Sequence, residues 1–214
     1  MEKNLIQLCG DKVLMLLFVV LMGVPALSFA QKRQIGSLAY LNTIAGVNGI
    51  KVGTDVATIS YSKLKYLDDD GKFDADSCLK FAVSDTARLK LDNDVRLNMI
   101  GVRTFKNKIV NIYLFFPKEN GYKIVKEFIA NYGGFFSKPD ANADIYKWDS
   151  ETVNLSVMYQ ADVEDGVAIF TSKPLVQHIS QEKEAIAARK KAKEMQATKA
   201  AAAAAKNVLT YARQ

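Results

Sequence analysis

Histidine and cysteine, the side chains that most often serve as bases, nucleophiles and metal ligands, are almost absent from this sequence. There is one histidine, His178, and there are two cysteines, Cys9 and Cys78. So few thiols exclude a disulfide framework and a cysteine metal cluster. A nucleophilic Cys78 would need a histidine partner, and His178 lies far along the chain. Cys78, which is followed by Leu79, is therefore predicted to be a small buried hydrophobe.

Sequence motifs of common enzyme sites are missing as well. The sequence contains neither a Gly-x-Ser-x-Gly elbow nor a phosphate-binding loop. Asp and Glu are plentiful, so a carboxylate pair acting as a hydrolase is the one enzymatic alternative. No pair stands out by its spacing. We therefore predict a non-enzymatic protein without a cofactor.

The excess of positive charge is concentrated near the C-terminus. Residues 31–173 contain 19 Lys and Arg against 18 Asp and Glu, whereas residues 174–214 contain 8 against 3. A nucleic-acid-binding domain usually has a basic patch or stripe on its body. Because the body is close to neutral, no nucleic-acid partner is expected.

Residues 1–30 have the features of a secretory signal peptide. An apolar run from Val13 to Leu27 is followed by Ser28-Phe29-Ala30, which places small residues one and three positions before Gln31. The run is shorter than the roughly 20 residues that span a bilayer. We predict cleavage between Ala30 and Gln31 and export to the periplasm or the medium. An uncleaved N-terminal membrane anchor is the alternative.

Residues 31–48 form a lead-in to a predicted domain at 49–175, in which one pattern occurs twice. In the first unit, 49–117, Thr54 is a candidate N-cap. Apolar residues then recur at roughly helical spacing and predict a helix; they are Val56, Ile59, Leu64 and Leu67. Strands are predicted at 78–84, 95–105 and 109–116, with Asn107-Lys108 as the hairpin turn.

The second unit, 118–175, has a clearer helix followed by three strands. The helix has an apolar stripe of Ile124, Val125, Phe128, Ile129 and Tyr132, and Gly133-Gly134 end it. Strands are predicted at 144–148, 153–160 and 166–172. Alternation in the middle strand buries Leu155 beside Phe128 in the core. The pattern predicts an α+β fold whose mostly antiparallel sheet has its helices on one face.

Two stretches resemble known envelope domains. They are GIKVGTDVATI (49–59), a strand-Gly-helix opening, and IVKEFIANYGGFFSKP (124–139), a helix that ends in Gly and is followed by Pro. The tandem plan resembles β-lactamase-inhibitor-protein-like folds and, more distantly, the small outer-membrane assembly lipoprotein of the small-protein-A type. The resemblance implies protein binding in the cell envelope, although a shared fold does not by itself supply a function.

An acidic loop, DDDGKFDAD (68–76), is the metal candidate of the sequence. If Gly71 is the sixth position of an EF-hand loop, Tyr66 is the first and Ser77 the twelfth, and neither suits that role. A looser site could use Asp68, Asp70, Asp74 and Asp76. We favour a solvated turn, and expect no metal.

The strand KIVNIYLFFPK (108–118) has apolar side chains on both faces. Val110, Ile112, Leu114 and Phe116 alternate with Ile109, Tyr113 and Phe115. A one-layer sheet needs only one apolar face. Either residues 35–48 or the start of the tail cover the second face, or it is an aromatic patch that binds a partner. The candidates for such a patch are Tyr113, Phe115, Tyr146 and Trp148.

The tail, 176–214, is predicted to be one long solvated helix. From Ser180 to Ala212 it lacks Pro and Gly and consists mostly of strong helix formers. Ser180 is the expected N-cap, and Ile179 and Ile186 could dock that end on the domain. The next heptad positions are polar or small, which excludes a coiled coil; they are Lys193, Ala200 and Asn207.

The tail is also basic, which suggests a tether or an arm for an anionic envelope surface. The residues proposed for this arm are Arg189, Lys190, Lys191, Lys193, Lys199 and Lys206. The sequence as a whole predicts an exported scaffold or binding module whose partner is another envelope protein. A carrier of an apolar ligand between helices and sheet is the alternative, and a carboxylate-dependent hydrolase is the less favoured one.

Overall fold

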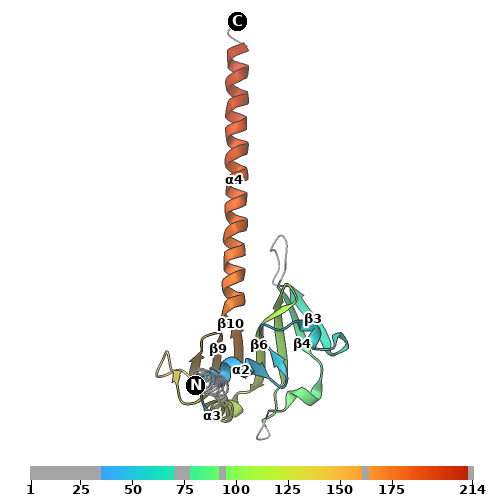
Figure 1. Ribbon diagram of the computed structural model, residues 1–214, viewed down its shortest axis with the longest axis vertical. Helices are drawn as coiled ribbons and strands as arrows, with labels where there is room; N and C mark the ends of the chain where they lie inside the picture. The colour runs from blue at the N-terminus through green and yellow to red at the C-terminus, as the bar shows by residue number, and fades with distance from the viewer. Residues whose placement is uncertain (1–34, 70–77, 92–94, 161–163, 212–214) are drawn as a thin grey trace, which may run out of the picture. The chain divides into compact units, whose positions relative to one another are not determined.

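The computed structural model describes residues 35–69, 78–91, 95–160 and 164–211 (Figure 1). Its main element is an eight-stranded antiparallel sheet in the spatial order β3-β4-β5-β6-β10-β9-β8-β7. The strands are β3 (Leu64–Asp69), β4 (Leu79–Val83), β5 (Met99–Phe105), β6 (Lys108–Pro117), β7 (Phe136–Ser137), β8 (Ile145–Asp149), β9 (Val153–Met158) and β10 (Asp165–Ser172). Strands β3 to β6 form one meander and strands β7 to β10 form a second. The two meanders pair through β6 and β10.

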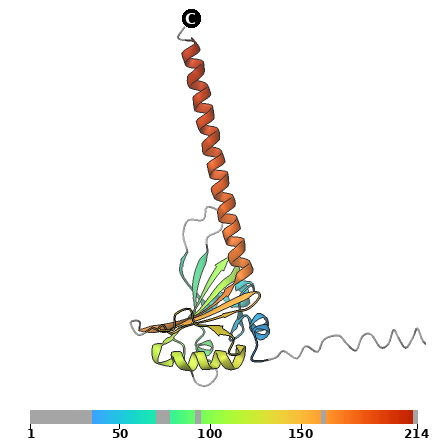
Figure 2. The same ribbon diagram turned by 90° about the vertical axis from the view of Figure 1, so that its left-hand side faces the viewer.

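Three α-helices accompany the sheet within the described residues. They are α2 (Leu38–Ile44), α3 (Gly121–Tyr132) and α4 (Lys173–Tyr211). Short 3₁₀ turns are η2 (Val56–Thr58), η3 (Tyr61–Lys63), η4 (Thr86–Leu89) and η6 (Lys118–Asn120), and a small hairpin is formed by β1 (Gly46–Val47) and β2 (Ile50–Lys51). Figure 2 shows α3 along one face of the sheet, while α4 leaves from its other side. The predicted α+β class and the long C-terminal helix are confirmed.

The main core lies between α3 and the sheet. Phe128 of α3 is 3 % exposed, and Leu155 of β9 is fully buried, as their periodicity predicted. The Phe128 ring meets Trp148 edge-on at 6.1 Å between centroids and Phe170 at 5.8 Å. Full burial of one large apolar side chain stabilises a fold by about 1.5–3 kcal/mol. This aromatic cluster is therefore a major source of stability.

Helix α3 ends where the sequence indicated. Gly133 has a φ of +84°, a conformation that glycine adopts readily. Its backbone N–H donates to the carbonyl oxygen of Ile129 at 2.8 Å. This bond satisfies one of the carbonyls that a helix end leaves without a partner.

Helix α2 fixes the lead-in segment to the same side of the sheet as α3. The Tyr40 and Tyr132 rings lie 6.2 Å apart. The Asn42 Oδ1 accepts hydrogen bonds from the Ser150 hydroxyl at 2.7 Å and from the Thr152 backbone N–H at 3.0 Å. The lead-in therefore does not cover the opposite face of the sheet. Residues 35–48 were one of the two segments expected to cover that face.

The helix predicted from Thr54 through Leu67 is wrong. The chain forms η2 and η3 there and then strand β3, which pairs with β4. Hydroxyl side chains bond locally instead of supporting a helix: Thr58 Oγ1 donates to the Asp55 carbonyl at 2.7 Å, and Ser60 and Ser62 share a hydrogen bond at 2.9 Å. Such bonds compete with the helical ladder.

The predicted faces of β6 are also wrong at Ile109 and Val110. The register with β5 shifts between Arg103 and Thr104, which pair with Asn111 and Ile109 and leave Val110 as the extra residue of a bulge. The bulge places Ile109 in the main core and Val110 in a smaller second cluster. Beyond it, Ile112, Leu114 and Phe116 face the core as predicted.

Helix α4 begins eight residues earlier than an N-cap at Ser180 predicts. It starts at Lys173, immediately after β10, and Ser180 lies inside it rather than at its N-cap. Pro174 lies in the first turn, where backbone N–H groups have no intrahelical partner and proline is tolerated. Because no loop separates β10 from α4, the sheet fixes the start of the helix.

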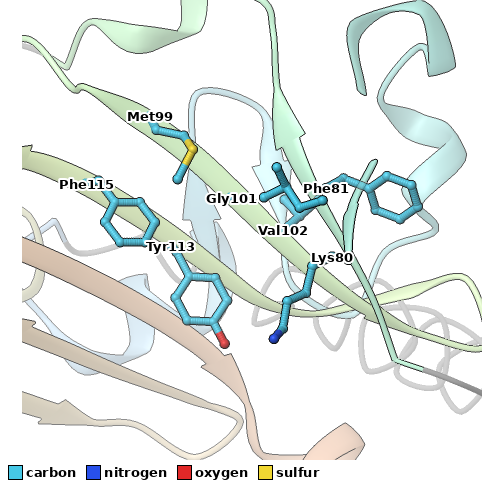
Figure 3. A pocket seen from close by; sticks show the side chains of 8 residues that line it. Lys80, Phe81, Met99, Gly101, Val102, Tyr113 and Phe115 are labelled. Atoms are coloured by element: carbon cyan, nitrogen blue, oxygen red, sulfur yellow. The ribbon is translucent and has the colours of Figure 1, made fainter. Parts of the chain in front are cut away.

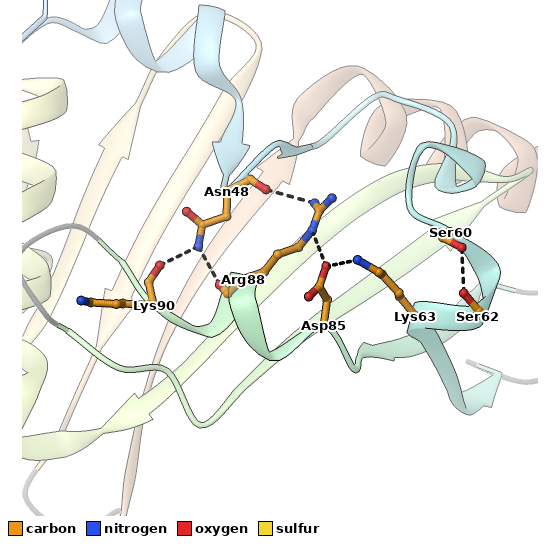
Figure 4. A network of polar contacts seen from close by, with 7 residues as sticks. All are labelled: Asn48, Ser60, Ser62, Lys63, Asp85, Arg88 and Lys90. Atoms are coloured by element: carbon orange, nitrogen blue, oxygen red, sulfur yellow. Dashed lines mark hydrogen bonds and ion pairs between the residues drawn. The ribbon is translucent and has the colours of Figure 1, made fainter.

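A polar network holds the β1–β2 hairpin against the segment that precedes β5 (Figure 4). The Asn48 side-chain amide donates to the carbonyl of Arg88 at 2.6 Å, and the Arg88 Nη1 donates to the Asn48 carbonyl at 3.0 Å. Asp85 lies 2.6 Å from Lys63 Nζ. The hydrogen bond from Lys63 is the main cause of the lowered pKa of Asp85. These contacts brace the β3–β4 end of the sheet.

Candidate functional site

The face of the sheet opposite α3, called here the open face, is the candidate site. Strand registers arrange its side chains in three rows. The apolar row is Met99, Phe115, Val167, Met158 and Ile145. The middle row is Ala82, Gly101, Tyr113, Ile169, Ser156 and Lys147. The polar row is Lys80, Arg103, Asn111, Thr171, Asn154 and Asp149.

The apolar side chains of the open face belong to neither core cluster. All five members of the apolar row, together with Tyr113 and Ile169, are only half-buried. The Tyr113 and Phe115 rings are stacked at 6.4 Å with 19° between their planes. Helix α4 starts on this side of the sheet (Figure 2). The result is a continuous apolar band over five strands.

The polar row is joined by hydrogen bonds. Arg103 Nη1 donates to Asn111 Oδ1 at 3.3 Å, and Asn111 Nδ2 donates to Thr171 Oγ1 at 2.9 Å. At the end of the row, Asp149 lies 2.5 Å from Lys173 Nζ. The hydrogen bond from Lys173 is the main cause that lowers the pKa of Asp149. This edge of the open face is therefore an ordered polar border.

A pocket of about 270 Å³ opens at the β3–β4 end of the open face (Figure 3). Its lining residues are Leu67, Lys80, Phe81, Met99, Gly101, Val102, Tyr113 and Phe115. Figure 3 shows the Lys80 ammonium and the Tyr113 hydroxyl pointing to the same side of the pocket. The pocket thus combines an apolar hollow with polar groups at one side.

The first turns of α4 pack on a second small core beside the β5–β6 turn. Ile179 is 6 % exposed and belongs to a cluster with Cys78, Phe105 and Val110. Cys78 is fully buried. The start of the tail therefore covers this corner, while the seven apolar side chains of the open face remain half-buried.

Polar contacts also hold the base of α4. Lys106 forms an ion pair with Glu182, and His178 Nε2 lies 3.7 Å from the same carboxylate. The Lys106 hydrogen bond is the main cause that lowers the pKa of Glu182. The base of the helix is thus tied to the β5–β6 turn.

The predicted aromatic patch is divided between the two faces of the sheet. Tyr113 and Phe115 lie on the open face, whereas Tyr146 and Trp148 lie on the α3 face. Trp148 is fully buried, and its indole N–H donates to the carbonyl of Gly133 at 2.9 Å. Its inclusion in a partner-binding patch is therefore wrong, because α3 and its C-terminal turn cover that face.

Several open-face residues were not among the sequence candidates. They are Met99, Gly101, Ile145, Met158, Val167 and Ile169. Val167 and Ile169 do give a signal, since they are apolar residues on the second face of an alternating strand. Their place in the candidate site followed only from the strand registers, which put Val167 beside Phe115 and Ile169 beside Tyr113.

Residues of the predicted basic arm lie along α4. Arg189, Lys190, Lys191, Lys193 and Lys199 are all exposed, and Lys206 lies further along the same helix. None of the described helices has both the length and the apolar character needed to cross a bilayer.

Within the described part of the chain, no group of three His, Cys, Asp or Glu side chains could hold a metal ion. Asp70, Asp74 and Asp76 of the acidic loop lie outside the described residues, as does the side chain of Asp68. The shifts resolved for described carboxyl groups lower their pKa values, each mainly through a hydrogen bond from a lysine. A comparison with known protein families, curated proteins and solved structures gives no match.

Proposed function

We propose that this chain is an exported, non-enzymatic envelope protein that binds another protein through the open face of its sheet. The supporting observation is the band of seven half-buried apolar side chains outside both cores. Single exposed apolar residues are ordinary, but a contiguous patch bordered by polar groups is typical of interaction sites. The polar row lies along one edge of this apolar band, as a polar rim lies beside an interface core.

The carrier alternative has less support. It requires an enclosed apolar cavity between the helices and the sheet. Side chains fill that space, including the fully buried Ile124 and Phe170. The hydrolase alternative is not favoured either, since Asp85, Asp149 and Glu182 are all bound to lysines.

Site-specific photo-crosslinking tests the proposed binding face. A photoreactive residue replaces Ile169, in the centre of the open face, and Lys126, on the exposed side of α3, provides the control position. We expect one discrete crosslinked protein from position 169 and none of that mass from position 126. Adding Phe115→Asp should abolish the product while the circular dichroism spectrum stays unchanged. The same product from both positions would contradict the proposal.

Helix α4 is proposed to act as a spacer and a basic arm. Its described side chains from Ala187 to Ala201 are exposed, and they include five cations against Glu194 alone. Exposed charges act over about 8–10 Å at moderate ionic strength and are screened by salt. The full chain should therefore bind phosphatidylglycerol vesicles in 50 mM salt and dissociate in 500 mM salt. Deleting residues 184–214 should remove that binding, and salt-independent binding would contradict the role.

A further inference from the structure

We propose that a small polar pocket between α2, the β1–β2 hairpin and α3 binds a primary amine in its ammonium form. The pocket lies on the α3 side of the sheet, away from the open face. The inference is therefore independent of the proposed function, and it assigns a second binding site together with the chemical class of its ligand.

The size and lining of the pocket limit what it can hold. Its volume of about 150 Å³ equals the space of roughly five water molecules at about 30 Å³ each. Sites for whole small molecules usually begin at roughly 300 Å³, so this pocket fits a group of a few heavy atoms. The described lining residues include no lysine, arginine or histidine. The polar side chains that line the pocket are Tyr40, Asn48, Glu127, Asn131 and Tyr132.

The first support is a hydroxyl group on a buried side chain. Tyr132 is only 4 % exposed, and no group in the described part of the chain hydrogen-bonds to its hydroxyl. All fully buried side-chain oxygen and nitrogen atoms of that part do have partners. The Tyr132 hydroxyl is therefore not sealed inside the protein, and it reaches the pocket that this side chain lines. A polar group in such a position needs a ligand or a water molecule to complete its hydrogen bonds.

The second support is the orientation of the two amide side chains. Asn131 Nδ2 donates to Glu127 Oε1 at 3.0 Å. Asn48 Nδ2 donates to the carbonyl oxygens of Arg88 and Lys90 at 2.6 and 3.0 Å. Both N–H groups of Asn48 are thus used, and Figure 4 shows its Oδ1 on the side away from those carbonyls. An amide oxygen only accepts hydrogen bonds, and an ionised carboxylate accepts from several donors at once. The pocket therefore calls for a donor.

The third support is the sign of the charge. Glu127 is the one charged residue among the described residues that line the pocket. Burial is the main cause that raises the pKa of Tyr132, and Tyr40 and Glu127 raise it further. The surroundings of the hydroxyl therefore disfavour a second negative charge. A primary ammonium brings a positive charge and three N–H donors. The Tyr40 and Tyr132 rings, 6.2 Å apart, add aromatic faces that attract a cation.

Three probes separate charge from hydrogen bonding. Ethylammonium chloride carries both features, ethanol has nearly the same shape without the charge, and tetramethylammonium chloride has the charge without an N–H group. Binding to the full chain is measured at constant ionic strength by NMR shifts of the methyl groups of Ile44, Val47 and Leu91, which line the pocket. We expect a Kd on the order of 1–10 mM for ethylammonium. Tetramethylammonium should bind at least tenfold more weakly, and ethanol should give no saturable shift.

Matched variants locate the site. Tyr132→Phe removes only the hydroxyl and should weaken ethylammonium binding about five- to tenfold. Without the amine its melting temperature should stay unchanged, because no hydrogen bond within the described protein is lost. Glu127→Gln should weaken binding about tenfold or more, since a charge-assisted hydrogen bond becomes a neutral one. The controls are Tyr122→Phe and Glu119→Gln, which make the same chemical changes at exposed positions and should leave binding unchanged.

Several results would overturn the inference. If ethylammonium gives no saturable shift even tenfold above the expected Kd, the pocket holds water only. Ethanol that binds as well as ethylammonium removes the charge requirement, and tetramethylammonium that binds more tightly removes the need for an N–H donor. Unchanged binding in Tyr132→Phe places the amine elsewhere. The crosslinking from position 169 bears on the proposed function alone, so the two proposals can fail separately.

Discussion

The indole N–H of Trp148 on β8 donates a buried hydrogen bond, 2.9 Å long, to the carbonyl oxygen of Gly133 at the C-terminus of α3. The bond joins the sheet to the end of the helix that covers it. It also gives the polar atom of a fully buried side chain a partner, without which burial would be costly. Trp148 is therefore a structural residue, and its neighbour Phe136 packs against it at 5.4 Å between ring centroids.

Replacing Trp148 by Phe should destabilise the domain by about 1–3 kcal/mol, because the Gly133 carbonyl loses its buried partner. Urea unfolding followed by circular dichroism measures the change. Tyr122→Phe is the control, since Tyr122 is 71 % exposed and its substitution should stay within about 0.5 kcal/mol. Equal effects of the two substitutions would contradict the structural role of the indole.

Truncation of core and open-face residues should have clearly different effects. Phe128→Ala and Leu155→Ala each remove a buried side chain and should lower the free energy of unfolding by about 2–5 kcal/mol. Phe115→Ala removes a half-buried ring and should cost about 1 kcal/mol or less. Chemical denaturation of the three variants checks this. A loss at Phe115 as large as that at Phe128 would mean that the open face is a core.

The thiol of Cys78 should report on the docking of α4. Ile179→Ala loosens the small cluster that buries Cys78 and should raise its alkylation rate by iodoacetamide. The measurement uses chains with Cys9→Ser, so that one thiol remains. Deleting residues 184–214 is the matched control and should leave both the rate and the melting temperature almost unchanged. Faster alkylation in the deletion variant would mean that the distal helix also stabilises the cluster.

Acid should loosen the base of α4. The pKa of Glu182 in the folded protein lies below its usual value of 4.5, mainly because of the hydrogen bond from Lys106. Its contribution to stability is therefore present above about pH 4.5 and is lost as the pH falls through the lowered pKa. Hydrogen-exchange protection factors for residues 175–183 should fall in this range. Glu182→Gln should lower them already at pH 6, and its own pH response should be flatter.

Export predicts a shortened chain. If the leader is cleaved between Ala30 and Gln31, intact-mass analysis of the exported protein should give the mass of residues 31–214. Replacing Ala30 by Arg should block processing, since small residues are required at that position. A mass that still includes Met1 would favour the membrane-anchored alternative.

Patterns within one element were enough to predict part of the fold. The stripe from Ile124 to Tyr132 and the glycine after it specify α3, because helix periodicity and capping are local properties. Alternation predicted β9 for the same reason. The helix predicted over Val56–Leu67 was wrong although the spacing of its apolar residues is helical. Local hydroxyl hydrogen bonds and pairing with β4 favour turns and a strand there.

By itself, the sequence determined the α+β class, the core positions Phe128 and Leu155, and a helical tail, since each depends on propensity or period along a short stretch. Only the tertiary structure decided that Tyr113 and Phe115 join Val167 and Ile169 on one face while Trp148 is buried on the other. It alone formed the pocket beside Gly101 and brought Tyr40 and Asn48 to the pocket that Tyr132 lines. Strand order and register pair residues that are distant in sequence, and a one-residue bulge or slip changes the face of every side chain beyond it.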